Sequence, residues 1–596
     1  MLLLLLSLVP LFAGPLIVRI LQTWKPFARM LDSFILVTVA GLIVIHILPH
    51  TIHEAGWMAL LAAAVGMAVP FVAERFLLHE RPDKWTPVLA LGVAALMVHG
   101  VLDGVALAGS EKHAHYSEFL AIAVLLHRLP AGLAIWWLVR PRLGRRSALL
   151  VLSALAAATI AGFTGSLLGW PDMFSGTPWF ITQALLAGSL VHIVLHQSLG
   201  PASPKHHSVW QLASLSGAIL GVTALWVTEH LQESHDHHSH LGEVFLGLAT
   251  LCAFPMLLTY LVTFLLHGFF PAASKMLGRF RSGVTGGLQG AFLGTLFNPC
   301  SCANSERLSE RVAGGYSTSA ALSYSVVAPV SGLGALFMSI PLLGFTGGAI
   351  RIAIALFVVF LLGGLLGRTR HRRQAAGVSL MVHHHEHHHQ SLEGGRWLQA
   401  FRAGWVEAPL QTLPWLMVGL GLAALVAELL PVTVFQNLPD VYHVPLATVA
   451  SVFTYICAAG STPVVAVLIS KGLTWGAGLV ILVAGPVANR RTYSLIARHL
   501  GRTTARLVVA AVLVAANLMG WLVDWLVDLE REFAFSHLHD GHEVGEWILL
   551  GLFALLLLVT IARSGVPNFL SVVLALHGHT HHEPDRDKDQ RGQEIQ

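Results

Sequence analysis

The sequence has few charged residues and few cysteines, and it leaves no room for a large soluble domain. Charged residues make up only 11% of the 596 residues, whereas hydrophobic residues make up 55%. Apolar runs of roughly 18 or more residues, long enough to cross a bilayer as helices, recur along nearly the whole length. These proportions exclude an ordinary soluble protein and predict an integral membrane protein.

The four cysteines are Cys252, Cys300, Cys302 and Cys457, and all of them fall in apolar segments. This placement excludes the disulfide framework of a small secreted protein. The first twenty residues lack the basic start and the small-residue cleavage site of a signal peptide, so they are expected to remain as a first span. The net charge of +4 gives no support to nucleic-acid binding. The lipid bilayer is the expected surrounding, and a homodimer is the candidate assembly.

Histidine, in contrast, is abundant. The chain has 34 histidines, many of them in four tracts that begin at His235, His383, His537 and His577. Two interpretations stay open: the tracts capture Zn, Ni or Cu beside a pore, or they are low-complexity loops.

One stretch of the chain returns in altered form. Residues 297–332 contain NPCSC, and residues 455–489 contain CAAGSTP. Aligning Cys300 with Cys457, an offset of 157 residues, also aligns Gly315 with Gly472 and Pro329 with Pro486. This spacing indicates an internal duplication in which each copy interrupts an apolar helix. Such paired interruptions mark the substrate site of many transporters.

Basic loops define the expected topology. Eight apolar segments precede the first histidine tract, near residues 3–22, 33–52, 57–78, 86–108, 118–139, 147–169, 180–199 and 209–229. Lys and Arg follow the first, third, fifth and, weakly, the seventh segment. By the positive-inside rule, the N-terminus and the His235 tract lie outside, in the periplasm.

The same rule orients the second half of the chain. Seven spans are expected, near residues 242–268, 316–341, 346–367, 403–430, 473–489, 505–527 and 546–563. The Cys300 segment then dips into the membrane from the cytoplasm and the Cys457 segment from the outside, so the repeats are inverted. The fold class is therefore an all-α polytopic membrane protein with about 15 spanning helices and two re-entrant broken-helix hairpins in inverted repeats.

These expectations divide the chain into six parts. They are an eight-helix membrane domain (1–230), a His-rich periplasmic linker (231–241), repeat one (242–367), a His-rich cytoplasmic linker (368–402), repeat two with the last span (403–565), and a cytoplasmic tail (566–596).

The paired NPCSC and GSTP motifs, each followed by a Gly and then a Pro, resemble a bacterial predicted-permease family that includes organoarsenical efflux permeases. The resemblance covers about residues 240–565 and implies a secondary transporter, in some members an exporter of trivalent organoarsenicals held by thiolates. By position, it makes Cys300, Cys302 and Cys457 the candidate ligands. Independently, soft thiolates select Cu(I), Zn(II), Cd(II) or trivalent arsenic. The alternative is that these cysteines are merely small apolar residues, as we expect for Cys252.

Other polar residues of the two breaks are candidate substrate contacts: Asn298, Glu306, Ser461 and Thr462. Glu306 could relay protons at membrane depth. It could equally lie in a solvated hairpin tip, paired with Arg307 or Arg311. Broken helices need polar groups in any case, so the other three are weaker indications.

Residues 1–230 resemble the ZIP family of metal transporters. VHGVLDGVAL, residues 98–107, looks like the H-N-x-x-D-G motif of that family, and LLHRLPAGLA, residues 125–134, looks like its H-E-x-P-H-E motif. His99, Asp103 and His127 are retained. The other ligand positions differ, with Gly100, Arg128, Ala131 and Gly132 in place of Asn, Glu, His and Glu.

Further histidines could complete a metal site in this half. Pairs four residues apart share a helix face, and imidazole binds Zn, Cu, Ni and Fe. The candidate ligands are His46, His50, His99, Asp103, His127, His192 and His196. Bound Zn or another divalent transition metal is thus the candidate cofactor, with none attached covalently; the alternative is that these are hydrogen-bonded core histidines. Arg128 is expected either to take Asp103 as its counter-ion or to replace the charge of a metal.

The sequence therefore predicts a non-enzymatic permease of the bacterial inner membrane, with its N-terminus outside and its C-terminus in the cytoplasm. It would move a transition metal ion or a thiophilic metalloid, in the direction of efflux by resemblance, through the cysteine-bearing half. One alternative is a divalent metal importer that works through the ZIP-like half. Another is a non-transporting metal sensor or a thiol oxidoreductase, although no C-x-x-C motif is present.

Overall fold

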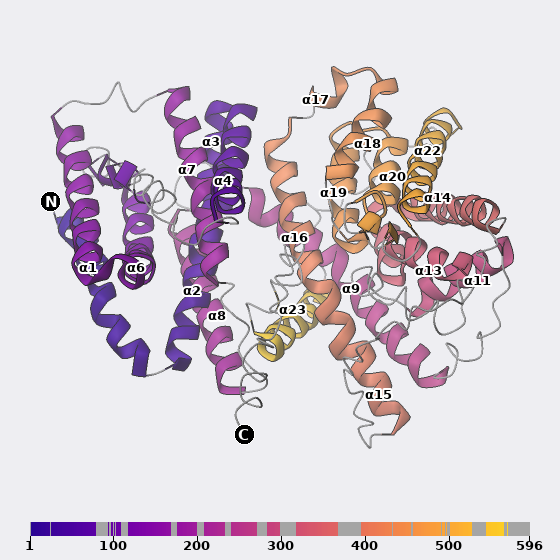
Figure 1. Ribbon diagram of the computed structural model, residues 1–596, viewed down its shortest axis with the longest axis horizontal. Coiled ribbons are helices and arrows are strands. Elements are labelled where there is room, and N and C mark those ends of the chain that lie inside the picture. Colours follow the sequence, from indigo (N-terminus) through magenta and orange to yellow (C-terminus); the bar gives the residue numbers. More distant parts are fainter. Residues whose placement is uncertain are drawn as a thin grey trace, which may run out of the picture.

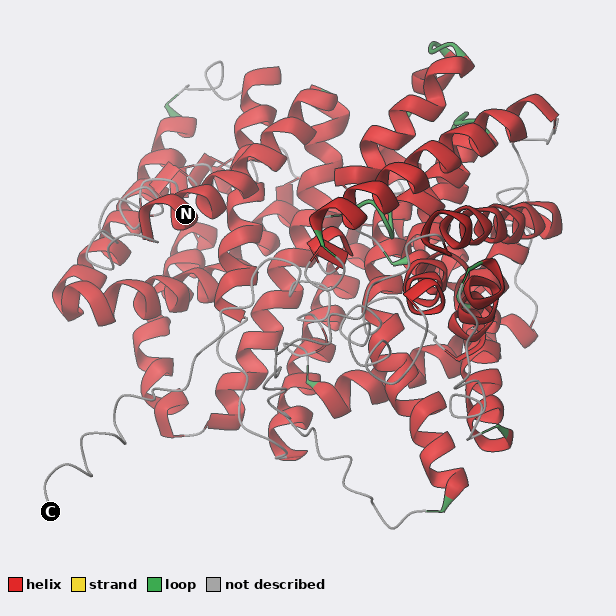
Figure 2. Ribbon diagram, turned by 45° about the vertical axis from the view of Figure 1, so that its right-hand side comes forward, coloured by secondary structure: helices red, strands yellow, loops and turns green. Residues whose placement is uncertain are grey.

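The computed structural model is helical throughout the residues that it describes, with no strand among them (Figure 2). These residues are 2–23, 25–78, 93–108 except 94–96, 99, 102 and 106, 117–168, 176–198, 208–232, 240–270, 283–297, 318–367, 395–431, 433–453, 457–489, 492–494, 496–497, 501–526, 544–565 and 569. The expected all-α polytopic membrane protein is confirmed. The count of about 15 spans stays a prediction, since several expected spans include residues outside these ranges.

Six of the described helical stretches are long and apolar enough to cross a membrane. They are Leu143–Leu167, Gly242–Phe269, Leu333–Leu361, Arg396–Leu429, Arg502–Leu526 and Val544–Ser564. Five of them coincide with an apolar segment expected from the sequence, because runs of such length have no other way to satisfy their backbone groups in lipid. Leu333–Leu361 instead joins the end of the expected span 316–341 to most of the expected span 346–367.

The helices of the first half follow the expected segments. They are α1 (Leu2–Thr23), α2 (Lys25–Leu42), a π-helical turn (Ile43–Ile47), α3 (Leu48–Ala55), α4 (Trp57–Leu78), α6 (Ser117–Leu167), α7 (Thr177–Ser198) and α8 (Ser208–Gln232). Gly144, with φ 84°, breaks α6 into the two spans that were expected separately. The expected segment 86–108 is described only from residue 93 onward.

Glycines bring helices of this half into backbone contact. A methyl group on Gly66 of α4 would overlap the carbonyl oxygen of Leu185 in α7, and one on Gly188 of α7 would overlap that of Ala63. Gly217 of α8 meets the carbonyl oxygen of Met30 in α2 in the same way. Small residues at helix crossings are the usual packing device in membranes, where lipid is as apolar as the helix surface.

The helices of the second half are α9 (His240–Phe269), α11 (Val284–Phe297), α13 (Thr318–Ser331), α14 (Leu333–Gly367), α15 (Arg396–Arg402), α16 (Ala408–Leu429), α18 (His443–Phe453), α19 (Ala458–Ser470), α20 (Trp475–Ala484), α22 (Arg502–Leu526) and α23 (Val544–Ser564). Their large shared core is built from α9, α14, α16, α19, α20 and α22. In Figure 1 this half lies beside the first half, with α23 between α8 and α9 and with α16 also in direct contact with α3. Helix α23 contacts α8 on one side and α9 on the other.

Helix starts in the second half repeat at the offset of 157 residues that aligns Cys300 with Cys457. Helix α13 begins at Thr318 and α20 at Trp475. Gly344, which breaks α14 with φ 72°, corresponds to Gly501, which precedes α22 with φ 89°. The internal duplication thus extends to the backbone geometry, because both copies place a left-handed glycine immediately before the same helix.

Equivalent helices of the two copies run in opposite directions. The offset matches α9 with α15 and α16. Phe264 of α9 packs against Phe401 of α15. Tyr260, one turn before Phe264, hydrogen-bonds Thr412 of α16, which comes after Phe401 in the chain (O···O 2.7 Å). The contacts thus move backward along α9 as they move forward along α15 and α16. The two helices are therefore antiparallel, which is the relation that inverted repeats require.

The second broken segment folds back on itself. After α18 and α19, the backbone N–H of Thr474 donates to Nδ1 of His443, the first residue of α18 (3.3 Å). The residue that precedes α20 therefore lies beside the first residue of α18, 31 residues earlier in the chain, as expected for a re-entrant hairpin. In the first copy, Gly287 and Gly290 of α11 face Ser323 and Ala320 of α13 in reverse order, so α11 and α13 are antiparallel. The offset of 157 residues equates α13 with α20 and not with the returning helix α19, so this pair does not test the first hairpin. The connection between α11 and α13 lies outside the described residues.

Two boundaries differ from those expected. The span expected from residue 403 begins at Arg396, inside the expected linker, because Trp397 is packed against Phe264 and Phe269 of α9. The span expected at 316–341 is divided between α13 and α14 at Gly332. Elsewhere, α9 and α22 begin and end within a few residues of their expected limits.

Candidate site at the second broken helix

Cys457 lies at the N-terminus of α19, where the broken segment reopens as a helix. Its backbone is extended (φ −56°, ψ 147°) and its carbonyl oxygen accepts from the N–H of Ser461 (2.8 Å). Its side chain is buried, with 3% exposed, and does not cap the helix. A buried sulfur thus lies at the electropositive end of a helix, a position that attracts anions.

The two polar residues predicted one turn further on are also buried. Ser461 donates to the carbonyl oxygen of Ala458 (3.3 Å), and the hydroxyl of Thr462 donates to the same oxygen (2.7 Å). Both hydroxyl groups therefore donate their hydrogen bond to a backbone carbonyl of their own helix, and both hydroxyl oxygens can still accept a hydrogen bond. The oxygen of Thr462 does accept such a bond from another helix.

The acceptor on Thr462 binds an arginine that the sequence reasoning missed. Arg351, in the second part of α14, is fully buried and donates from Nη1 to Thr462 Oγ1 (2.9 Å). The bond joins helices of the two inverted copies, 111 residues apart in the chain. A lone arginine inside an apolar run, GAIRIAIALF, was the available signal, since ionisable residues at membrane depth are functional candidates by default.

Arg351 is held by neutral acceptors of its own copy as well. Nε donates to the carbonyl oxygen of Val330 (2.8 Å), and Nη1 contacts Ser339 Oγ (2.9 Å) and the carbonyl oxygen of Ala335 (3.3 Å). Nη2 is buried and makes no hydrogen bond. Cys457 lies within electrostatic reach of the guanidinium. The site therefore combines a fixed cation, a buried sulfur and a helix N-terminus.

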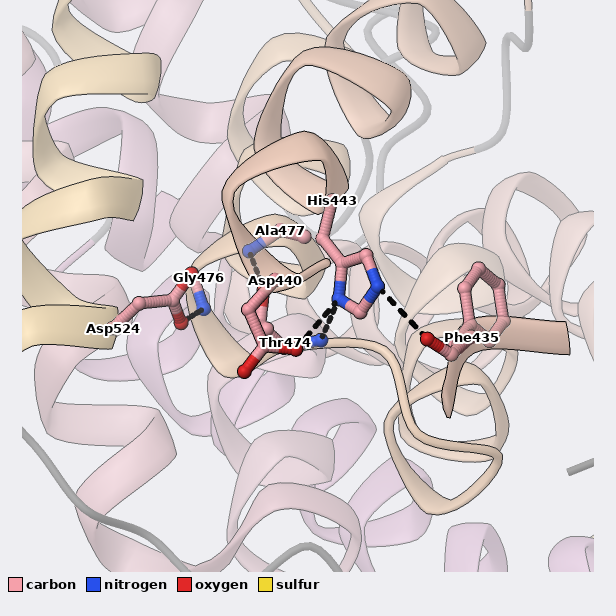
Figure 3. A network of polar contacts seen from close by, with 7 residues as sticks. All are labelled: Phe435, Asp440, His443, Thr474, Gly476, Ala477 and Asp524. Atoms are coloured by element: carbon pink, nitrogen blue, oxygen red, sulfur yellow. Dashed lines mark hydrogen bonds and ion pairs between the residues drawn. The ribbon is translucent and has the colours of Figure 1, made fainter. Parts of the chain in front are cut away.

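The far end of the hairpin is closed by a second polar network (Figure 3). His443 is fully buried; its Nε2 lies 3.2 Å from the carbonyl oxygen of Phe435 and its Nδ1 lies 3.3 Å from the N–H of Thr474. These partners fix the neutral tautomer with the proton on Nε2, because Nδ1 must accept. Asp440 Oδ1 lies 3.7 Å from the same Nδ1.

Asp524 of α22 holds the start of α20 in this network. Its Oδ1 accepts from the N–H of Gly476 (2.7 Å), while Thr474 caps α20 by accepting from Ala477 (3.4 Å). A carboxylate beside a helix N-terminus is stabilised by the helix dipole. The loop between α19 and α20 is thus fastened to α18 by His443 and to α22 by Asp524.

Two further residues have structural explanations. Asn489 donates to the carbonyl oxygen of Pro486 (2.8 Å) and accepts from the N–H of Thr492 (2.9 Å), so it satisfies a turn. Cys252 is fully buried in the apolar core between α9 and its neighbours, as expected for a packing residue. Asn298, Cys300, Cys302 and Glu306 lie outside the described residues, so their place in the site stays a prediction.

In the first half of the chain, Arg128 occupies the expected metal region with Asp103 as its counter-ion. Arg128 Nη2 lies 3.0 Å from Asp103 Oδ2, and both side chains are at most 8% exposed. The same Nη2 donates to Thr159 Oγ1 (2.9 Å). The first of the two outcomes expected for Arg128 is therefore realised, and Asp103 is engaged by a cation that would repel a metal ion.

The remaining metal candidates of this half are not brought together in the described part of the chain. His50 is exposed and packs edge-on against Phe180. Within the described residues, no group of three or more His, Cys, Asp or Glu side chains could hold a metal ion. His99 lies outside these residues. The side chains of His46, His127, His192 and His196 also lie outside them, so the metal site stays a prediction.

Comparison with known proteins gives one match. Residues 244–525 match the model of a family described as predicted permease. No curated protein and no solved structure matches the chain. The matched segment contains Cys457, Arg351 and nearly all of both inverted copies, and it supports a membrane transporter of the permease type.

Proposed function

We propose, from the permease match of residues 244–525, that this protein exports a thiophilic metalloid or a soft transition metal ion across the bacterial inner membrane. The inverted copies would form the pathway, and Cys457 would be one of the ligands that hold the cargo. Cys300 and Cys302 of the first copy would complete a soft ligand set by their equivalent position in the duplication.

The observation that carries the proposal is the position of Cys457. Cys457 is buried at the N-terminus of α19, inside the apolar core of the second half. A sulfur there can bind a soft electrophile without a covering water shell, and the helix dipole supports its thiolate. Arg351, within electrostatic reach, supports it further.

The ion pair of Arg128 with Asp103 supports a secondary role for the first half. A divalent importer needs free carboxylate and imidazole ligands, whereas Asp103 is already neutralised at 3.0 Å by a buried guanidinium. The main flux is therefore assigned to the second half, with the first half assisting or regulating it.

Transport into everted membrane vesicles tests the proposal, with phenylarsine oxide as a neutral thiophilic probe. Cys457→Ser should abolish most of the ATP- or gradient-dependent accumulation, because loss of one soft ligand from a three-ligand site weakens it by roughly 10–100-fold. Cys252→Ser is the matched control, since that thiol is also fully buried but lies in the apolar core.

Full accumulation by the Cys457→Ser protein would remove the thiolate hypothesis. The division of labour is tested separately by His99→Ala and His127→Ala. If either substitution abolishes accumulation as completely as Cys457→Ser does, the first half is an obligatory part of the pathway.

A further inference from the structure

Arg351 carries a permanent positive charge in a fully buried position, and its partners do not neutralise it. A guanidinium stays protonated in proteins. Its described partners are carbonyl oxygens and hydroxyls, namely those of Val330, Ala335, Ser339 and Thr462. None of the described Asp and Glu side chains forms an ion pair with it. The sulfur of Cys457 lies within electrostatic reach and would balance this charge only as a free thiolate. Once that sulfur is bonded to a soft electrophile, the guanidinium loses this balance, so the loaded site is suited to receive an anion.

The unused hydrogen-bonding capacity points the same way. Nη2 of Arg351 is buried and has no partner. At the adjacent N-terminus of α19, the side chain of the N-cap residue Cys457 makes no capping bond to the first N–H groups of the helix. An anion placed here would accept from Nη2 and from the helix N-terminus together, which is how broken transporter helices bind acidic groups.

We propose that the cargo site has an anion subsite formed by Arg351 Nη2 and the N-terminus of α19, and that the preferred cargo is a thiophilic group joined to a carboxylate or another oxyanion. This inference rests on the proposed function, because Cys457 would hold the thiophilic end. Oxygen anions suit the subsite best, since a guanidinium N–H and helix N–H groups form short charge-assisted bonds with them.

The position of Arg351 also couples the subsite to both halves of the transporter core. The guanidinium is anchored on α13 and α14 in the first copy and reaches Thr462 in the second. An anion bound at Nη2 therefore lies at the junction between the two inverted copies. Only a cargo with the anionic group would use this contact.

Two probes that differ in one group test the inference on the full-length protein in nanodiscs and vesicles. The neutral probe is phenylarsine oxide and the anionic probe is its para-carboxylate derivative. The wild-type protein should bind and accumulate the anionic probe at least about tenfold better, the usual effect of a hydrogen bond to a charged group. Arg351→Gln should remove this preference, so that the ratio of anionic to neutral probe, both bound and accumulated, falls to about one.

Two variants separate the charge from the fold. Arg351→Lys keeps the cation and should retain part of the preference, whereas Thr462→Val removes one acceptor of Arg351 and should retain most of it. If Arg351→Gln fails to fold, the wild-type preference and the Arg351→Lys protein decide the question. A wild-type protein without preference for the carboxylate overturns the inference.

An internal counter-ion is the competing explanation, and Glu306→Gln and Glu310→Gln test it. If the preference appears only after one of these substitutions, the anion subsite is already filled by the protein and the inference is wrong. Failure of the proposed function gives a different result, namely no Cys457-dependent accumulation of either probe. The binding preference in nanodiscs still decides on the anion subsite in that case.

Discussion

Arg128 and Arg351 are both buried, but their charges meet different surroundings. Arg128 contacts the carboxylate of Asp103 at 3.0 Å, whereas Arg351 contacts only neutral oxygens among the described residues. A buried cation that is paired with a carboxylate is stable without a ligand, whereas a buried cation with only neutral hydrogen-bond partners can attract an anionic ligand. At the scale of residues, the first arginine thus has a structural role, and we propose a functional role for the second.

Removal of either partner of the Arg128 pair should be strongly destabilising. Arg128→Met removes the cation that faces the buried carboxylate of Asp103, and Asp103→Asn removes the anion that faces the buried guanidinium; each should lower the free energy of unfolding by about 3–5 kcal/mol. The double variant Arg128→Met, Asp103→Leu should recover most of this loss. Thermal unfolding of the purified proteins, followed by circular dichroism, measures the three changes.

Additive losses in the double variant would show that the two side chains act independently, contrary to the 3.0 Å contact. Ser147→Ala, in the same long helix but with an exposed hydroxyl bonded only to its own turn, is the control and should change the stability little.

At the scale of elements, the position of α19 depends on a glycine of α16. A methyl group on Gly419 would overlap the carbonyl oxygen and Cα of Gly460, in the first turn of α19. The two helices thus cross in backbone contact beside Cys457. No side chain can be accommodated there without displacing the helix that carries the candidate site.

Gly419→Ala should therefore reduce transport at least about tenfold, since small displacements of binding groups are costly. Gly421→Ala, two residues further along α16, is the matched control because nothing lies within 4 Å of its added methyl group. Accumulation of phenylarsine oxide in vesicles, normalised to the amount of folded protein, gives the comparison. Equal activity of the two variants would contradict the close crossing.

The return of the hairpin depends on His443. His443→Ala removes the acceptor of the Thr474 N–H and leaves that donor and the carbonyl oxygen of Phe435 without their partner in the core. Each unsatisfied buried group costs about 1–3 kcal/mol, so the midpoint of thermal unfolding should fall and amides of residues 472–476 should exchange faster.

The control for this prediction is Asp440→Asn, since Asp440 is 61% exposed and lies 3.7 Å from the ring. An exposed contact of this kind contributes little to stability. If Asp440→Asn destabilises the hairpin as much as His443→Ala does, the charge of the pair, and not the hydrogen bonds of the ring, holds the segment.

At the scale of the whole molecule, the antiparallel packing of α9 with α15 and α16 fixes the relative orientation of the two copies. It does not by itself say which side faces the cytoplasm. The distribution of Lys and Arg predicts that assignment, with the linker 231–241 in the periplasm and the linker 368–402 in the cytoplasm.

Labelling of single cysteines introduced into the two linkers checks this assignment. An impermeant maleimide should modify the first linker in intact cells, and the second only after the membrane is permeabilised. Modification of the second linker in intact cells would reverse the orientation of the transporter core and with it the direction of each hairpin.

Much of the architecture was determined by the sequence alone. The lengths of the apolar runs located the helices, since a chain in lipid must satisfy its backbone groups within each run. The spacing of Cys300, Gly315 and Pro329 against Cys457, Gly472 and Pro486 revealed the duplication. The apolar runs are local features of the chain, and the repeated Cys, Gly and Pro positions recur at a constant offset. Both can therefore be found in the sequence without knowledge of the three-dimensional structure.

The contacts of the candidate site were decided only by the tertiary structure. The bond between Arg351 and Thr462 and the crossing of Gly419 over Gly460 depend on how each helix is rotated about its axis. In an amphipathic helix, the sequence shows which face points away from the core, so its rotation about the helix axis can be predicted. In a helix that is apolar on all sides, the sequence gives no such indication. In this protein the core helices are of the second kind, so backbone contact at glycines and a few buried hydrogen bonds choose the rotation.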